Sequence, residues 1–189
     1  MKKNIFLHVI TTLGCMICAI LLCAAQTSFL PNFLNDALFV SDLLLCMTVG
    51  LGVLTGRTKC GTYGSAYAVI FGIFAGILAD CTAGCGIFLL PLLYMLCGYG
   101  AYVCADLLPY KKFFVYLAVG AASAALRVIV AVIYVLLSEG SVPLPDIAQY
   151  VCIPLFLGTV IALLPVYPAS LLLTLPIRKI KHQNIDKFT

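Results

Sequence analysis

Residues 111–137 read KKFFVYLAVGAASAALRVIVAVIYVLL, and this stretch decides the fold. Two lysines are followed by an apolar run longer than the roughly 20 helical residues that cross a bilayer core of about 30 Å. A single charge, Arg127, interrupts the run. The stretch therefore predicts a transmembrane helix that begins at a basic boundary and carries one ionisable side chain inside the membrane.

The rest of the chain repeats this pattern. Hydrophobic residues make up 63% of the 189 positions and charged residues only 10%, so the apolar residues form long runs. Six runs are long enough to span a bilayer, at about residues 5–25, 37–54, 61–79, 87–107, 113–137 and 150–175. We therefore predict an all-α integral membrane protein with one six-helix transmembrane domain over residues 1–189, of which 176–189 form a basic cytoplasmic tail.

Basic residues alternate along the chain and predict its orientation. They lie before the first run, between the second and third, between the fourth and fifth, and after the sixth: Lys2, Lys3, Arg57, Lys59, Lys111, Lys112, Arg178, Lys179, Lys181 and Lys187. The other three connections contain only acidic charges, Asp36, Glu139 and Asp146. The positive-inside rule then places both termini in the cytoplasm. The net charge of +4 is thus a topology signal that suits an anionic lipid surface, and it does not indicate nucleic-acid binding.

Catalytic patterns are missing from the predicted spans. The two histidines, His8 and His182, lie near the cytoplasmic side, and the single glutamate, Glu139, lies in a connection. Intramembrane serine, metal-dependent and glutamate proteases need such groups at mid-membrane depth. We therefore predict no enzymatic activity, cofactor or metal. Cys81 and Cys85 flank a short external turn, and the sequence leaves open whether they form a disulfide.

Two ionisable residues lie inside predicted spans at similar depths. Counted at about 1.5 Å per residue, Asp42 lies roughly 8 Å and Arg127 roughly 9–15 Å below the outer ends of their helices. Charges inside a membrane usually face the bundle interior and pair with one another. We therefore predict an intramembrane ion pair of Arg127 with Asp42, with Asp80 as an alternative or shared partner. Its role is either to specify packing or to bind a ligand.

The third run carries small residues at every fourth position, and they end at Asp80: Gly64, Ala68, Gly72 and Gly76. In lipid, a stripe of small residues lets two helices approach closely. The stripe predicts a close-packing face, and the partner is either another helix of the same bundle or a helix of a second protein.

The order and spacing of four short motifs resemble a known family. Gln26-Thr-Ser-Phe-Leu-Pro31 follows the first run, and Ser41-Asp42 opens the second. Gly72-x-x-x-Gly76-x-x-x-Asp80 closes the third, and the fourth contains Tyr94-x-x-x-Gly98-Tyr99. This pattern resembles the bacterial rod shape-determining protein MreD family over about residues 20–105. One difference is Ser41, where the family usually has proline.

The resemblance implies a function and partners. It implies a non-enzymatic scaffold in the bacterial cytoplasmic membrane that supports cell-wall elongation and rod shape. Its expected partners are the membrane protein MreC and, through it, the glycosyltransferase RodA, a class B penicillin-binding protein and cytoskeletal MreB.

Two other functions remain open. The family is similar in architecture to the substrate-binding subunits of energy-coupling-factor vitamin transporters, which are six-helix bundles of this size. Such a subunit needs an externally open apolar cavity with several polar groups, but the chain has no tryptophan and its predicted outer connections are poor in polar residues. A small secondary transporter would use Asp42 and Arg127 as its site and usually shows an internal repeat. We find no such repeat between residues 1–95 and 96–189.

Overall fold

The structure is a computed structural model that describes residues 2–29, 42–56, 62–83, 89–139 and 143–185, and every regular element in these ranges is helical. In chain order the elements are α1 (Lys2–Ala24), the π-helical turn η1 (Ala25–Phe29), α3 (Leu43–Gly56), α4 (Thr62–Ala83), α5 (Leu89–Leu107), α6 (Lys112–Glu139), α7 (Leu144–Ile147), the π-helical turn η2 (Ala148–Cys152) and α8 (Ile153–Ile185). The predicted all-α class is therefore confirmed.

Five helical segments are long and apolar enough to cross a membrane: Val9–Thr27, Gly64–Thr82, Leu89–Leu107, Lys112–Leu137 and Pro145–Leu175. A sixth apolar helix, α3, has 14 residues in the part of the chain that the structure describes. The start predicted for it, residues 37–41, lies outside the described residues. The several long apolar helices identify a multi-pass membrane protein.

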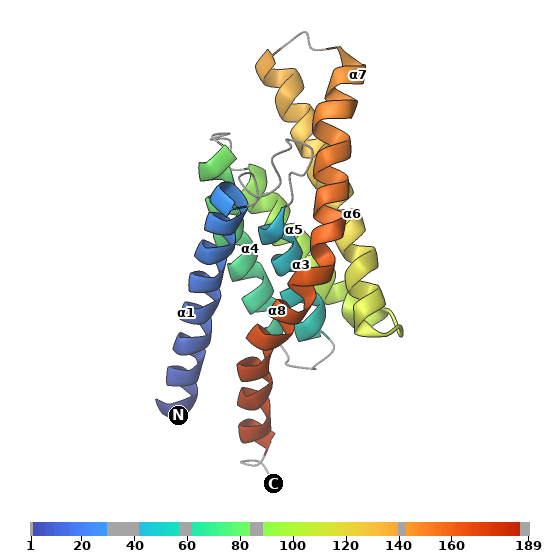
Figure 1. The fold of residues 1–189 in the computed structure, drawn as a ribbon. Coiled ribbons are helices and arrows are strands. Elements are labelled where there is room, and N and C mark those ends of the chain that lie inside the picture. Colours follow the sequence, from blue (N-terminus) through green and yellow to red (C-terminus); the bar gives the residue numbers. More distant parts are fainter. Residues whose placement is uncertain (1, 30–41, 57–61, 84–88, 140–142, 186–189) are drawn as a thin grey trace.

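The shortest of these helices, α3, lies at the centre of the bundle (Figure 1). It packs against α1, α4, α5, α6 and α8, and every residue from Leu44 to Gly56 is buried. In contrast, α1 and α6 expose rows of large apolar side chains, among them Leu13, Leu21, Leu126 and Ile133. Such rows suit contact with lipid tails, so the buried α3 is the core around which the outer helices assemble.

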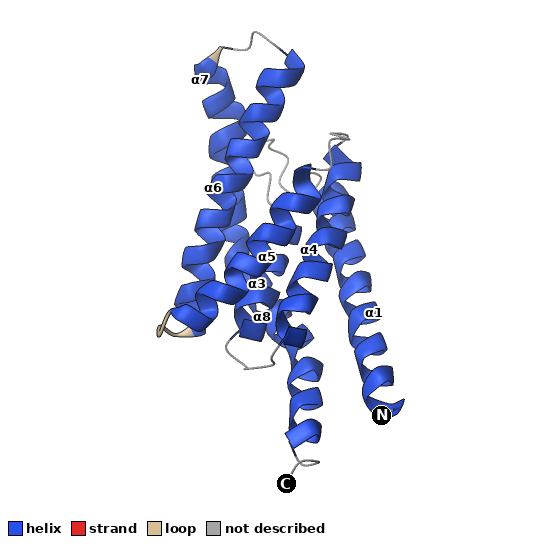
Figure 2. Cartoon of the chain, turned by 180° about the vertical axis from the view of Figure 1, so that it is seen from behind, coloured by secondary structure: helices blue, strands red, loops and turns tan. Residues whose placement is uncertain are grey.

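The two ends of the bundle differ in shape. Both termini lie at the same end, and the short helix α7 lies at the opposite end (Figures 1 and 2). There, the adjoining ends of α6 and α8 extend beyond the ends of α1, α4 and α5 in both views. As a result, one flank of α6 rises above the shorter helices next to it.

Candidate functional site

Asp42 directly precedes α3 and caps its N-terminus. The backbone N–H of Leu45 donates a hydrogen bond of 3.1 Å to Asp42 Oδ1, and the backbone carbonyl of Asp42 accepts one of 3.2 Å from the N–H of Cys46. The first N–H groups of a helix have no partner within the helix, and an aspartate at this position supplies one. Its negative charge is also favoured at the positive end of the helix dipole. Asp42 Oδ1 therefore caps the N-terminus of α3.

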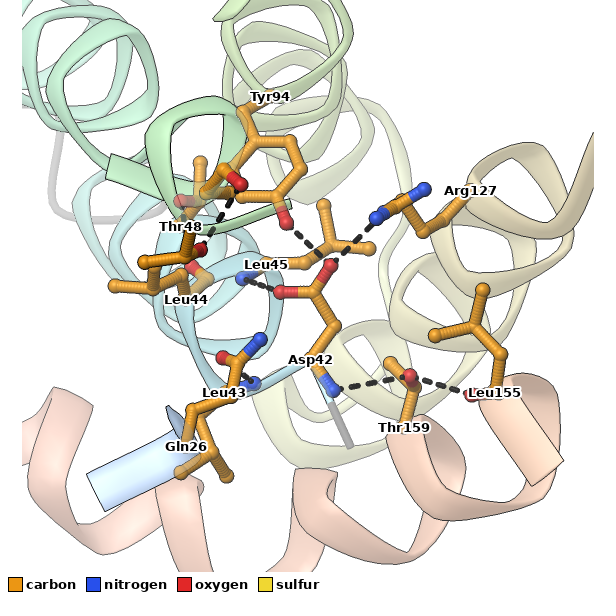
Figure 3. A network of polar contacts seen from close by, with 12 residues as sticks. Gln26, Asp42, Leu43, Leu44, Leu45, Thr48, Tyr94, Arg127, Leu155 and Thr159 are labelled. Carbon is orange, nitrogen blue, oxygen red and sulfur yellow. Dashed lines mark hydrogen bonds and ion pairs between the residues drawn. The ribbon is translucent and has the colours of Figure 1, made fainter. Parts of the chain in front are cut away.

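The second carboxylate oxygen of Asp42 joins α3 to two other helices. Tyr94 on α5 donates its hydroxyl hydrogen bond to Asp42 Oδ2. Arg127 on α6 donates from Nε to the same oxygen at 3.2 Å, which makes an ion pair (Figure 3). The Asp42 side chain is 2% exposed and that of Arg127 is 15% exposed, so the pair is nearly shielded from the surroundings. A single buried oxygen thus connects α3, α5 and α6.

Two neutral side chains complete the attachment of the α3 N-terminus (Figure 3). The backbone N–H of Asp42 donates to the Thr159 hydroxyl of α8 at 3.3 Å, and this hydroxyl donates to the carbonyl of Leu155 at 2.6 Å. The backbone N–H of Leu43 donates to Oε1 of Gln26 in η1 at 3.1 Å. We call Gln26, Asp42, Tyr94, Arg127 and Thr159 the Asp42 cluster; it links η1, α5, α6 and α8 to the start of α3.

The Asp42 cluster is a hydrogen-bonded network that fixes the positions of the helices it joins. Both carboxylate oxygens of Asp42 already accept hydrogen bonds. Bringing two charges out of water is expensive, and a buried pair is tolerable only when further hydrogen bonds satisfy its remaining groups. Here the cap, the tyrosine hydroxyl and the guanidinium provide those bonds. A satisfied buried network of this kind fixes one arrangement of its helices.

Asp80 occupies a different position from Asp42. It lies near the end of α4, is 7% exposed, and lines a pocket of about 230 Å³ together with Arg127. The sequence offered Asp42 and Asp80 as alternative or shared partners of Arg127. The structure gives Asp42 the Nε contact of the guanidinium and places Asp80 in the pocket wall.

The small-residue stripe of α4 faces α5 inside the same chain. A Cβ atom built on Gly72 would lie 2.7 Å from the carbonyl oxygen of Tyr94, and one built on Gly76 would collide with Cα of Pro91. These neighbours are backbone atoms, so α4 and α5 approach as closely as glycine allows. Of the two partners left open by the sequence, the structure places a helix of the same bundle against this stripe.

The rest of the stripe extends the same contact. Ala68 is fully buried, and its carbonyl oxygen would lie 2.9 Å from a Cβ atom on Gly98 of α5. Gly64 is also buried. Gly98 faces α3 as well, because its own carbonyl oxygen would meet a Cβ atom on Gly52. Gly98 therefore lies where α3, α4 and α5 come together.

Some predicted residues are outside the described part of the chain, and others gain a role that the sequence had not assigned. Pro31 and Cys85 lie outside it, whereas Cys81 is exposed. Tyr94 and Gln26 were singled out only as motif residues, and Thr159 was missed. A hydroxyl within an apolar run is a weak signal, since it is also compatible with a bond to its own helix.

Among the described residues, no group of three His, Cys, Asp or Glu side chains is arranged to hold a metal.

Comparisons with known proteins provide no relative: no family model, no curated protein and no solved structure matches the chain.

Proposed function

We propose that the chain spans the bacterial cytoplasmic membrane six times with both termini in the cytoplasm. The five long helices and the central α3 supply six apolar segments. The common end of the two termini supports the even count (Figure 1). The 14 residues of α3 are fewer than a bilayer span needs, but α3 is buried among other helices. A helix surrounded by protein does not have to match the bilayer thickness by itself.

The orientation is tested by labelling single cysteines from outside the cell. In a variant whose native cysteines are replaced, Asp146→Cys should react with a membrane-impermeant maleimide in intact cells. Lys111→Cys should react only after the membrane is opened. Both positions are exposed, so accessibility within the fold is matched. The reverse pattern would place the termini outside.

We propose further that the protein is a non-enzymatic scaffold of the cell-wall elongation machinery, as its resemblance to the MreD family implies. The observation that carries this proposal is the convergence of the motif residues. Gln26, Asp42 and Tyr94 belong to three separate motifs, yet all bond to the first turn of α3 or to its cap. Motif residues that join several helices through buried hydrogen bonds suit a scaffold, because a scaffold needs one fixed arrangement of its helices.

The surface of the bundle also suits this role. The small residues of α4 are used within the chain, so they are not the surface for a partner. The exposed apolar rows of α1 and α6 remain available for contact with lipid or with the membrane helix of MreC. Contact through MreC then connects the scaffold to RodA, a class B penicillin-binding protein and, indirectly, MreB.

A vitamin-binding subunit of an energy-coupling-factor transporter is the second candidate. The observation that favours it is the pocket of about 230 Å³, whose lining contains two charged side chains and Tyr134 among aliphatic residues. The pocket lies between α4, α5 and α6, beside the Asp42 cluster. The scaffold explains the convergence of the motif residues, which the transporter function does not require.

Co-purification separates the two functions. The tagged chain is expressed together with the MreC encoded in the same genome, and in a second strain with the ATPases and membrane coupling protein of that genome's vitamin transporter. The scaffold predicts near-stoichiometric recovery of MreC from neutral detergent, whereas a single-span protein with an unrelated external domain should be washed away. Recovery of the transporter components without MreC would contradict the proposal.

A further inference from the structure

The pocket beside the Asp42 cluster lies between the last turn of α4, the first turn of α5 and the second half of α6. Its lining runs from the buried Leu90 to the exposed Leu89 and Leu137, so the pocket opens at the surface of the bundle. α6 continues past the ends of α4 and α5 and forms the tall side of the pocket (Figures 1 and 2). Arg127 lines the same pocket, so a small molecule can reach it from outside the bundle.

Arg127 has more hydrogen-bond donors than the protein uses. A guanidinium carries five N–H groups, and Nε donates one of them to Asp42 at 3.2 Å. The Tyr94 hydroxyl is the other polar neighbour of the guanidinium, and the described residues supply no further acceptor for it. The guanidinium extends beyond the Asp42 contact (Figure 3), and 15% of the side chain is exposed. N–H donors of Arg127 are therefore left for a group in the pocket.

The remainder of the pocket suits an apolar body. Apart from Asp80, Arg127 and Tyr134, the lining side chains are aliphatic, and Asp80 has an interaction of its own. The volume of about 230 Å³ exceeds the roughly 150 Å³ of a dry cavity that binds benzene in another protein. The pocket therefore has room for a ring of that size together with a short polar group. It offers hydrogen-bond donors at one end and apolar surface along α6.

We propose that this pocket binds a neutral carbonyl compound, a molecule that joins one ketone, ester or amide oxygen to an apolar body about the size of a benzene ring. The carbonyl oxygen accepts a hydrogen bond from a terminal N–H of Arg127, and the apolar body lies along Val130, Ala131 and Tyr134 of α6. A neutral acceptor suits this position because Asp42 already matches the charge of the guanidinium. An anion would have to leave water without gaining an unmatched cation, which is costly. This binding is independent of the proposed scaffold role.

The test compares three probes of nearly the same shape. Acetophenone carries a carbonyl group on a ring, α-methylstyrene has CH₂ in place of the carbonyl oxygen, and benzoate has a carboxylate in place of the acetyl group. Thermal unfolding of the full chain in neutral detergent is followed with a thiol-reactive fluorogenic dye that reports exposure of its buried cysteines. A ligand that binds only the folded state raises the unfolding midpoint with increasing concentration. Acetophenone should do so at concentrations at least tenfold lower than either of the other probes.

A second measurement detects the hydrogen bond itself. The carbonyl stretching band of isotope-labelled acetophenone should move to lower frequency in the presence of the protein, because a charge-assisted hydrogen bond from a guanidinium weakens the C=O bond. Ala131→Phe fills the pocket without changing a charge, and it should abolish both the band shift and the rise in the unfolding midpoint. Ala122→Phe adds the same ring at an exposed position of α6 outside the pocket, and it should leave both unchanged.

Arg127→Lys tests the guanidinium directly. Lysine keeps a cation for Asp42 but has a single ammonium group in place of the planar fork of donors. The preference for acetophenone over α-methylstyrene should therefore be lost in this variant.

Several outcomes would overturn the proposal. Equal stabilisation by acetophenone and α-methylstyrene would mean that the pocket selects apolar shape alone, and a preference for benzoate would mean that the guanidinium recognises charge. No stabilisation by acetophenone, or no band shift, would mean that Arg127 does not bind the ketone. If Arg127→Lys does not fold, Ala131→Phe and Ala122→Phe decide, and an unchanged band shift in Ala131→Phe would place the binding elsewhere.

Discussion

Replacing Arg127 with methionine should lower the free energy of unfolding by about 3–5 kcal/mol, the usual result of breaking a buried ion pair from one side. The loss arises because Asp42 is 2% exposed and would be left buried without the guanidinium that pairs with it. Asp42→Asn should also destabilise the bundle, since the guanidinium is then the unmatched charge. Asparagine is chosen because it caps a helix about as well as aspartate, so the bond to the N–H of Leu45 survives.

The double variant Asp42→Asn/Arg127→Met is the decisive measurement. It contains neither charge, and its cost should fall short of the sum of the two single costs by on the order of 2 kcal/mol. Stability is measured by reversible unfolding in mixed micelles, and Asp146→Asn, an exposed carboxylate, serves as the control with little expected change. Strictly additive single costs would mean that the two charges do not stabilise each other.

Gly76→Ala should prevent recovery of folded protein, although it adds only one carbon atom. The new Cβ would collide with Cα of Pro91 and would lie 2.7 Å from the nitrogen of Pro91 and 2.8 Å from the carbonyl oxygen of Leu90. All three neighbours are backbone atoms of the first turn of α5, so no side chain can rotate away. Overpacking of a core typically costs about 1–3 kcal/mol, and we expect the upper end or more where whole helices must separate.

A matched control for this change lies on the facing helix. A Cβ atom on Gly100 of α5 meets nothing within 4 Å, so Gly100→Ala adds the same group without a collision. Alanine is also the better helix former, so the yield of folded protein should be maintained. The measurement is the monodisperse fraction in size-exclusion chromatography after neutral detergent extraction. Equal yields of the two variants would mean that α4 and α5 are not packed at this distance.

For the small-residue stripe of α4, the sequence predicted the type of contact but not the helix that makes it. The four-residue spacing of Gly64, Ala68, Gly72 and Gly76 identified a close-packing face, because only small side chains let helices approach. The spacing did not identify the neighbour. Lipid tails and helix surfaces are equally apolar, so a face that meets α5 has the same composition pattern as a face that meets a partner protein.

The central position of α3 was not predictable either. Its sequence is more apolar than those of the outer helices. This does not identify the centre of the bundle, because a helix that is hydrophobic all round is compatible with burial or with lipid. What distinguishes α3 is burial on every side by α1, α4, α5, α6 and α8. This burial depends on how the five other helices pack around α3, and the sequence of α3 alone does not determine it.

The sequence by itself determined the all-helical membrane class, because long apolar runs can satisfy their backbone groups in a bilayer only as helices. It also singled out Asp42 and Arg127 as candidates for an ion pair, since a charge at that depth is too costly to leave unmatched. Only the tertiary structure decided that Tyr94 and Thr159 join them and that Asp80 lines a pocket together with Arg127. The reason is that depth can be counted along a helix, whereas rotation about the helix axis and the choice of neighbour are set jointly by all the helices that pack together.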